Sequence, residues 1–268
     1  MQPYFQPYKQ SVIGYYRYGT GPKWVCCLHG YGESGKSFEW LEGFLGKDYT
    51  LIAIDFPFHG DTSWKEEAVI TAKDLLAIIQ SITQQTQLLV SLLGYSMGGR
   101  VALQLAMQIP QNIERLVLVA PDGLHENFWY RLATQTSVGN AFFRFTMRHP
   151  AWFLGFIQLA GKTGLLHKTI VKTTLHYIDT ATKRTQLYQR WTAMHRFRPN
   201  LATVKHQVAR YHIPVRLLFG SYDQVIRSKR GVQFRKGIEN QVRLQVIQAG
   251  HQLLKEKYGA VIAKQFYE

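Results

Sequence analysis

Hydrophobic residues occur along this chain mainly as short runs that contain at most two polar residues each. The runs at 23–28, 50–54, 88–93, 113–119, 214–219 and 242–247 predict strands. Runs without polar alternation are typical of strands that are covered on both faces of a sheet. Another strand is predicted at 11–18, where the turn Gly-Thr-Gly-Pro at 19–22 joins it to the next one.

The segments between these runs predict helices. They lie at 67–84, 97–109, 225–237 and 252–264. In the first of them, the apolar positions 72, 75, 76, 79 and 82 share one helical face. Pro110 closes the second. Strands that alternate with helices predict an α/β fold, in which helices flank a mostly parallel central sheet.

One long segment, residues 125–208, breaks this alternation. It contains no clear strand and is helical, aromatic and basic in character. We therefore expect a core of residues 1–124 and 209–268, with a helical cap inserted at 125–208 over the C-terminal edge of the sheet. The apolar stretch Ala151–Ala160 inside the insertion is expected to pack the cap onto the core. An acyl-binding channel and a lipid-contacting patch are the alternatives for this stretch.

The net charge of the chain is +15 and is concentrated in the same region. Between His125 and His212, thirteen basic residues stand against Glu126 and Asp179 alone. The charge predicts a solvated basic surface, or attraction to a small acyl substrate that is anionic or lipid-like, or weak contact with an acidic membrane. No nucleic-acid-binding motif accompanies it, so no nucleic acid partner is expected. The sequence leaves the oligomeric state open.

The remaining composition predicts a cytoplasmic protein. No run reaches the roughly 18 apolar residues that span a membrane, and the first ten residues do not resemble a secretory signal. Cys26 and Cys27 are adjacent inside a predicted strand, where their side chains point to opposite faces. They are therefore expected to be buried, reduced thiols without a bridge between them.

The run Gly94-Tyr95-Ser96-Met97-Gly98-Gly99 lies between a predicted strand and a predicted helix. A Gly-x-Ser-x-Gly sequence in that place predicts a sharp turn, in which the glycines leave room and the serine hydroxyl is exposed. A serine held in this way is a candidate nucleophile. It needs a base to accept its proton, and the base needs an acid to orient it.

The base and the acid are expected in loops that follow later strands. His251 follows the strand at 242–247, and Asp223 follows the strand at 214–219. Asp122, which follows the strand at 113–119, is the alternative acid. The predicted triad is Ser96, Asp223 and His251.

With these motifs the chain resembles the α/β-hydrolase fold superfamily, in the form of a serine hydrolase with a helical cap. His29-Gly30-Tyr31-Gly32 is similar to the oxyanion-loop motif of that family, and residues 55–62 are similar to its Asp-x-Pro-x-His-Gly-x-Ser/Thr loop. The resemblance implies an oxyanion hole formed by the backbone N–H groups of Tyr31 and Met97. It also implies carboxylic ester hydrolysis as the default activity, through an acyl-enzyme and without a cofactor, and leaves thioesters, amides and carbon–carbon bonds open.

Two other functions compete with this prediction. Residues 30–37 fit the Gly-x-x-x-x-Gly-Lys-Ser pattern of a phosphate-binding P-loop. That pattern explains nothing beyond residue 60, whereas the hydrolase motifs extend to His251. A non-catalytic, ligand-binding member of the fold is the second alternative, and a complete triad argues against it. The histidines lack metal-binding spacing, so no metal site is expected; His29 and His59 are expected to be structural.

Overall fold

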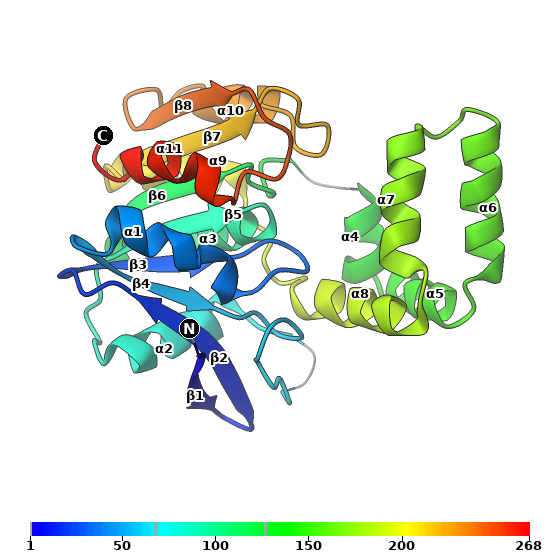
Figure 1. Cartoon of the computed structure of the whole chain (residues 1–268), viewed down its shortest axis with the longest axis horizontal. Helices are drawn as coiled ribbons and strands as arrows, with labels where there is room; N and C mark the ends of the chain where they lie inside the picture. The colour runs from blue at the N-terminus through cyan, green and yellow to red at the C-terminus, as the bar shows by residue number, and fades with distance from the viewer. Residues whose placement is uncertain (1, 67–68, 126–127) are drawn as a thin grey trace. The chain divides into compact units, whose positions relative to one another are not determined.

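The computed structural model describes residues 2–66, 69–125 and 128–268 (Figure 1). These residues form two compact units. The larger unit comprises residues 2–66, 70–125 and 196–268, and the smaller unit comprises essentially residues 128–195. None of the described helices is both long enough and apolar enough to cross a membrane.

The larger unit is built on an eight-stranded, mostly parallel sheet with the order β1-β2-β4-β3-β5-β6-β7-β8. β2 pairs antiparallel with both β1 and β4, and all the other neighbouring strands are parallel. The strands are β1 (Tyr4–Tyr8), β2 (Ser11–Tyr18), β3 (Lys23–Leu28), β4 (Tyr49–Ile54), β5 (Val90–Tyr95), β6 (Ile113–Val119), β7 (Val215–Gly220) and β8 (Val242–Ile247).

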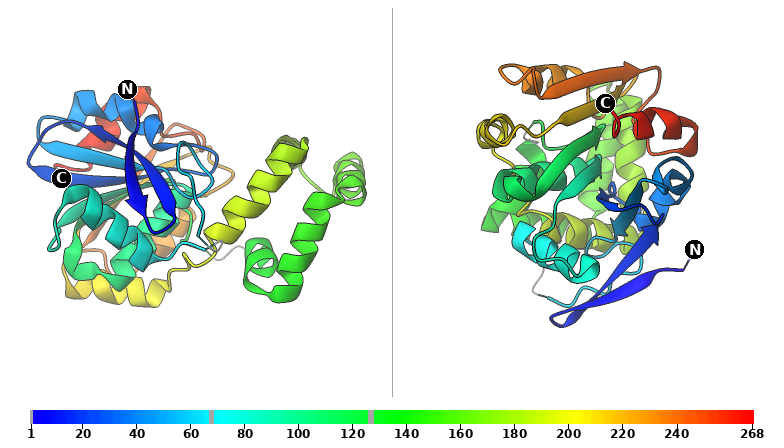
Figure 2. Two further views of the ribbon diagram at one scale, coloured as in Figure 1. Left: turned by 90° about the horizontal axis from the view of Figure 1, so that it is seen from below. Right: turned by 90° about the vertical axis from the view of Figure 1, so that its left-hand side faces the viewer.

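Helices cover both faces of this sheet (Figure 2). Cys27 and Leu93 point to one face, where they join a core cluster with residues of α1 and α11. Cys26 and Leu92 are equally buried but lie outside that cluster, on the face against which α3 packs. The helices of this unit are α1 (Glu42–Leu45), α2 (Ala72–Thr83), α3 (Met97–Gln108), α9 (Leu201–Arg210), α10 (Lys229–Arg235) and α11 (Gly259–Lys264). Both cysteines are free and buried, as predicted.

The strands agree closely with the prediction, whereas several helix ends do not. The sequence analysis missed β1, an edge strand that pairs only with β2. α2 begins at Ala72, because the side chains of Thr71 and Asp74 cap its first turn reciprocally. Of the helix predicted at 67–84, residues 67–68 lie outside the described part of the chain.

The two helices predicted near the C-terminus are also shorter than expected. α10 begins only at Lys229, because the backbone at Val225 and Ile226 donates to Asp223 instead. Only Gly259–Lys264 of the helix predicted at 252–264 is an α-helix. Leu253 and Leu254 are apolar because they are buried in the core, and not because they lie on a helical face.

The described residues of the smaller unit form helices and the loops that join them, without a strand. Its helices are α4 (Phe128–Gln135), α5 (Ser137–Arg148), α6 (Ala151–Lys162), α7 (Lys168–Ile178) and α8 (Ala181–Ala193). Its interior contains Phe143, Ile157 and Leu187. The insertion predicted at 125–208 extends further, into α9, but α9 packs against α3 in the larger unit. The role of the smaller unit as a cap stays a prediction.

Candidate active site

Ser96 lies in the tight turn between β5 and α3. Its backbone has φ 48° and ψ −115°, in the left-handed region that residues other than glycine rarely adopt. Two hydrogen bonds fix the strained conformation: the Ser96 N–H donates to Val119 O at 3.0 Å, and the Asp122 N–H donates to Ser96 O at 2.9 Å. The strain is therefore maintained by the neighbouring strand, as at many functional sites.

The glycines of this turn are required by close backbone contacts. A Cβ atom at Gly98 would lie 1.9 Å from Leu28 O, and one at Gly94 would lie 2.6 Å from Gly98 O. These contacts bring the start of α3 directly against the end of β3. Gly30 approaches from the other side, where a Cβ atom would lie 3.5 Å from Ser96 Cβ.

Gly98→Ala is therefore expected to destabilise the protein by about 3 kcal/mol or more, because Leu28 is paired with strands on both sides and α3 follows β5 directly, so neither can move away freely. Urea denaturation measures the effect. Gly43→Ala is the matched control, since a Cβ atom there meets nothing within 4 Å and alanine favours the helix. Wild-type stability in Gly98→Ala would contradict the close packing of the turn.

The structure brings the three predicted triad residues together. His251 Nε2 lies 3.1 Å from Ser96 Oγ, and His251 Nδ1 lies 2.8 Å from Asp223 Oδ2. Tyr95 holds the histidine loop by donating its hydroxyl proton to His251 O at 3.2 Å. Both contacts of the imidazole are within hydrogen-bond distance, so one ring can accept from the serine while it donates to the carboxylate.

Asp223 is fixed by the loop that follows β7. Its side chain is fully buried, and Oδ1 accepts hydrogen bonds from the backbone N–H groups of Val225 and Ile226, each at 2.8 Å. Oδ2 is thereby turned toward His251. The alternative acid, Asp122, makes other contacts: Oδ1 accepts from the Gly123 N–H at 2.7 Å and Oδ2 lies 3.5 Å from Arg100 Nη1.

The two expected oxyanion donors belong to segments that meet at the serine. Met97 is the first residue of α3, and N–H groups in a first helical turn have no partner within the helix. Tyr31 follows Gly30, which packs against Ser96. Positive charge at the start of α3 favours an anion there. Their role in binding an oxyanion stays a prediction.

The loops at 29–35 and 55–61 are tied together by buried polar groups. His29 Nε2 accepts from the Phe56 N–H at 3.1 Å, and Asp55 accepts from the N–H groups of Gly35 and Asp61. Burial raises the pKa of Asp55 to about 6. The Gly35 N–H is therefore engaged in the fold, whereas a phosphate-binding loop would offer such groups to its ligand. This hydrogen bond argues against the P-loop alternative.

Glu33 is a residue of this site that the sequence analysis missed. Its Oε2 atom is buried, and the described residues provide it with no hydrogen-bond partner. Burial raises the pKa of Glu33 to about 7, although the Gly30 backbone N–H and the nearby His251 act to lower it. In the sequence Glu33 occupies a variable position of the P-loop-like pattern at 30–37, and nothing in that pattern indicates a buried carboxyl group.

Glu33→Gln is expected to stabilise the protein above pH 7 and to leave its stability unchanged below pH 4. Because the carboxyl pKa is higher in the folded state, wild-type stability falls as the pH rises from about 4.5 to about 7. The cost at pH 8 is up to about 3 kcal/mol. Urea denaturation across this pH range measures it, and an equal difference between the proteins at every pH would contradict the proposed burial of charge.

No group of three or more His, Cys, Asp or Glu residues in the described part of the chain could hold a metal ion. The chemical groups that the site offers are therefore a hydroxyl, an imidazole, two carboxyls and backbone N–H donors. The Ser96 hydroxyl, the His251 imidazole and the Asp223 carboxyl belong to loops at the C-terminal edge of β5, β8 and β7, which is where parallel sheets place their ligands.

Comparisons with known proteins agree with this architecture. A family model of the alpha/beta hydrolase fold matches residues 23–258. The hydrolase YugF of Bacillus subtilis is 24% identical over 92% of this chain and 90% of its own length. An esterase of Thermogutta terrifontis superimposes with a TM-score of 0.68 and 16% identity, over 100% of this chain and 97% of that one.

A protein of Mycobacterium tuberculosis, Rv2715, is 30% identical to this chain over 180 residues. The match covers 62% of this chain and 49% of the relative. The chain thus spans about half the length of this curated relative. The likeness to the solved esterase shows the fold alone, because the identity is low.

Proposed function

Because the chain belongs to the alpha/beta hydrolase fold family, we propose that it is a serine hydrolase that cleaves a carboxylic ester or a related acyl bond. One observation carries the proposal: Ser96, His251 and Asp223 form a continuous chain of hydrogen-bond contacts that begins at a strained serine. The names of the relatives support hydrolysis and do not define the bond.

In the proposed first half-reaction, Ser96 Oγ attacks the carbonyl carbon while His251 Nε2 accepts the hydroxyl proton. The resulting imidazolium is stabilised by Asp223, whose carboxylate accepts a hydrogen bond from the Nδ1–H group of His251. The carbonyl oxygen becomes an oxyanion between the N–H groups of Met97 and Tyr31. Loss of one donor of this kind typically costs about 3–4 kcal/mol of transition-state stabilisation. His251 then protonates the leaving alcohol, and an acyl-enzyme remains.

The second half-reaction repeats these roles with water. His251 accepts a proton from the water, and the hydroxide attacks the acyl carbon. Collapse of the second oxyanion breaks the bond to Ser96, which recovers its proton from His251, and the acid product leaves. Glu33 is close enough to interact electrostatically with His251. Its ionised form favours the imidazolium that both steps generate.

A fluorophosphonate probe with intact-protein mass spectrometry tests the proposal. We expect one adduct on the wild-type protein and none on Ser96→Ala. Ser221→Ala is the matched control, because Ser221 is an exposed serine in the Asp223 loop and its loss should leave the labelling intact. A folded wild-type protein that forms no adduct would refute the proposal and favour the ligand-binding alternative.

A further inference from the structure

One face of α5 and α6 is exposed although it is rich in aromatic residues. We call it the α5–α6 aromatic face, and its members are Phe142, Phe145, Trp152, Phe156 and Leu159. Each of these side chains is at least 46% exposed. Large exposed apolar patches mark sites that bind a protein or a membrane. We propose that this face binds the surface of an anionic lipid bilayer.

The packing of α6 within the smaller unit uses a different stripe of the helix. Ile157 and Ala160 are buried, whereas the residues of the aromatic face lie on a neighbouring stripe of α6. α6 and α7 pack closely, since a Cβ atom at Gly161 would lie 2.9 Å from Val171 Cγ2. The unit therefore holds α6 in place without using the aromatic face.

The aromatic stripe of α6 follows helical spacing. Trp152, Phe156 and Leu159 stand at positions i, i+4 and i+7 and so share one side of the helix. A Cβ atom at Gly155, in the same stripe, would meet nothing within 4 Å. This side of α6 is therefore an apolar strip whose large side chains are each about half exposed.

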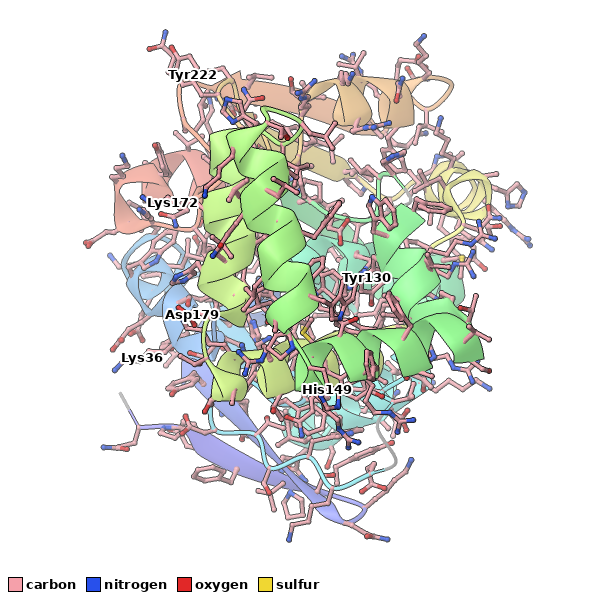
Figure 3. The ribbon with its side chains drawn as sticks, turned by 90° about the vertical axis from the view of Figure 1, so that its right-hand side faces the viewer. Lys36, Tyr130, His149, Lys172, Asp179 and Tyr222 are labelled. Atoms are coloured by element: carbon pink, nitrogen blue, oxygen red, sulfur yellow. The ribbon has the colours of Figure 1, made fainter. Side chains whose placement is uncertain are left out.

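α5 extends the strip sideways. The rings of Phe142 and Trp152 lie with their centroids 5.4 Å apart, which joins the two helices at the surface. His149 lies between the end of α5 and the start of α6 (Figure 3). The rings of Phe145 and His149 lie with their centroids 4.8 Å apart. The face is thus wider than a single helix and combines aliphatic, tryptophan and phenylalanine side chains, as do helices that bind at membrane interfaces.

The positive charge of the smaller unit favours an anionic partner for this face. Arg144, Arg148 and Lys162 are exposed on the same two helices. Across residues 128–195 the sequence contains a single acidic residue, Asp179, whose carboxylate is held by Lys183 Nζ at 2.8 Å. Little in the unit offsets its positive charge. Basic side chains around an apolar strip suit anionic headgroups above acyl chains, and their long stems let the charges stay at the headgroup level.

The length of α6 favours a position in the plane of the membrane. Its 12 residues extend about 18 Å, well short of a roughly 30 Å hydrocarbon core. A helix of this kind is expected to lie at the interface, with its apolar side in contact with the acyl chains. Binding should therefore require both the aromatic face and the neighbouring cations.

Vesicle co-sedimentation of the full chain tests the proposal without relying on hydrolase activity. We expect binding to vesicles of phosphatidylcholine mixed with phosphatidylglycerol, and at least tenfold weaker binding to phosphatidylcholine alone. The double variant Trp152→Ser/Phe156→Ser should weaken binding at least tenfold. Arg148→Glu/Lys162→Glu should do the same, and salt at about 0.5 M should release the wild-type protein.

Matched substitutions in the larger unit control for general surface effects. Leu89 and Val232 are 57% and 50% exposed, so Leu89→Ser/Val232→Ser removes a similar exposed apolar area elsewhere. Lys47→Glu/Lys229→Glu makes the same change in net charge as the basic pair. Both controls should bind vesicles like the wild-type protein. Thermal unfolding confirms that each variant is folded.

Quenching of tryptophan fluorescence by brominated lipid tests directly whether the aromatic face contacts the bilayer. Brominated phosphatidylglycerol should quench part of the tryptophan emission, and Trp152→Phe, which keeps the apolar contact, should lose that part while it still binds. Equal binding to neutral and anionic vesicles would overturn the proposal. An absence of binding to any vesicle would also overturn it. If the wild-type protein then self-associated and Trp152→Ser/Phe156→Ser did not, the face would be assigned to contact with a second copy of the chain.

Discussion

Replacement of Ser96 by alanine should lower kcat toward short nitrophenyl esters by about 10⁴- to 10⁶-fold. The variant retains His251 and the oxyanion donors but lacks the oxygen that forms the acyl-enzyme. Single- and multiple-turnover assays with purified protein measure the loss, with an ester-chain-length panel to select the best substrate. Activity within tenfold of the wild type would remove Ser96 as the nucleophile.

Stability separates a chemical defect from misfolding in this experiment. Ser96→Gly should be as inactive as Ser96→Ala but more stable than the wild type by about 1–2 kcal/mol, because φ 48° is strained for any residue with a side chain. A gain in stability together with a loss of activity would mean that the turn stores strain to position the hydroxyl. Equal stability of the wild type and Ser96→Gly would contradict that account.

The sheet could be predicted from the sequence because most of its strands are buried on both faces. A doubly covered strand such as β4 must be apolar at nearly every position, so its ends nearly coincide with the ends of the run predicted at 50–54. β1 was not predicted for the opposite reason, since it is a short, exposed edge strand with Gln6 and Pro7 at its centre. Helix ends were harder to predict because they depend on local caps. Leu253 and Leu254 were assigned to a helix because they are apolar, although they are apolar because they are buried.

The candidate site was predictable as far as topology dictates it. Ser96, Asp223 and His251 follow parallel strands, whose carboxyl ends meet at one edge, so their order along the chain was enough to place them together. Glu33 was not predictable, because its burial depends on how the loop at 29–35 folds against its neighbours. Charge in the smaller unit was visible in the sequence, whereas the exposure of its aromatic face required the structure.

The choice between the two acids rests on what each carboxylate contacts. Asp223 Oδ1 is occupied by two backbone N–H groups, so in Asp223→Asn the amide oxygen should remain on Val225 and Ile226. The amide NH₂ would then face His251 Nδ1. A donor at that position favours the tautomer with the proton on Nε2, which cannot accept the proton of Ser96.

Asp223→Asn should therefore lower kcat by about 10⁴-fold with little change in fold. Asp122→Asn should stay within about threefold of the wild type, because Asp122 contacts Gly123 and Arg100 and has no contact with His251. Steady-state kinetics on both variants, with circular dichroism as the folding control, makes the comparison.

The reverse ranking would transfer the acid role to Asp122. It would also require the loop after β6 to move toward His251 during turnover. A large loss in both variants would instead mean that Arg100 and Asp122 support the elbow, since the Asp122 N–H already donates to Ser96 O.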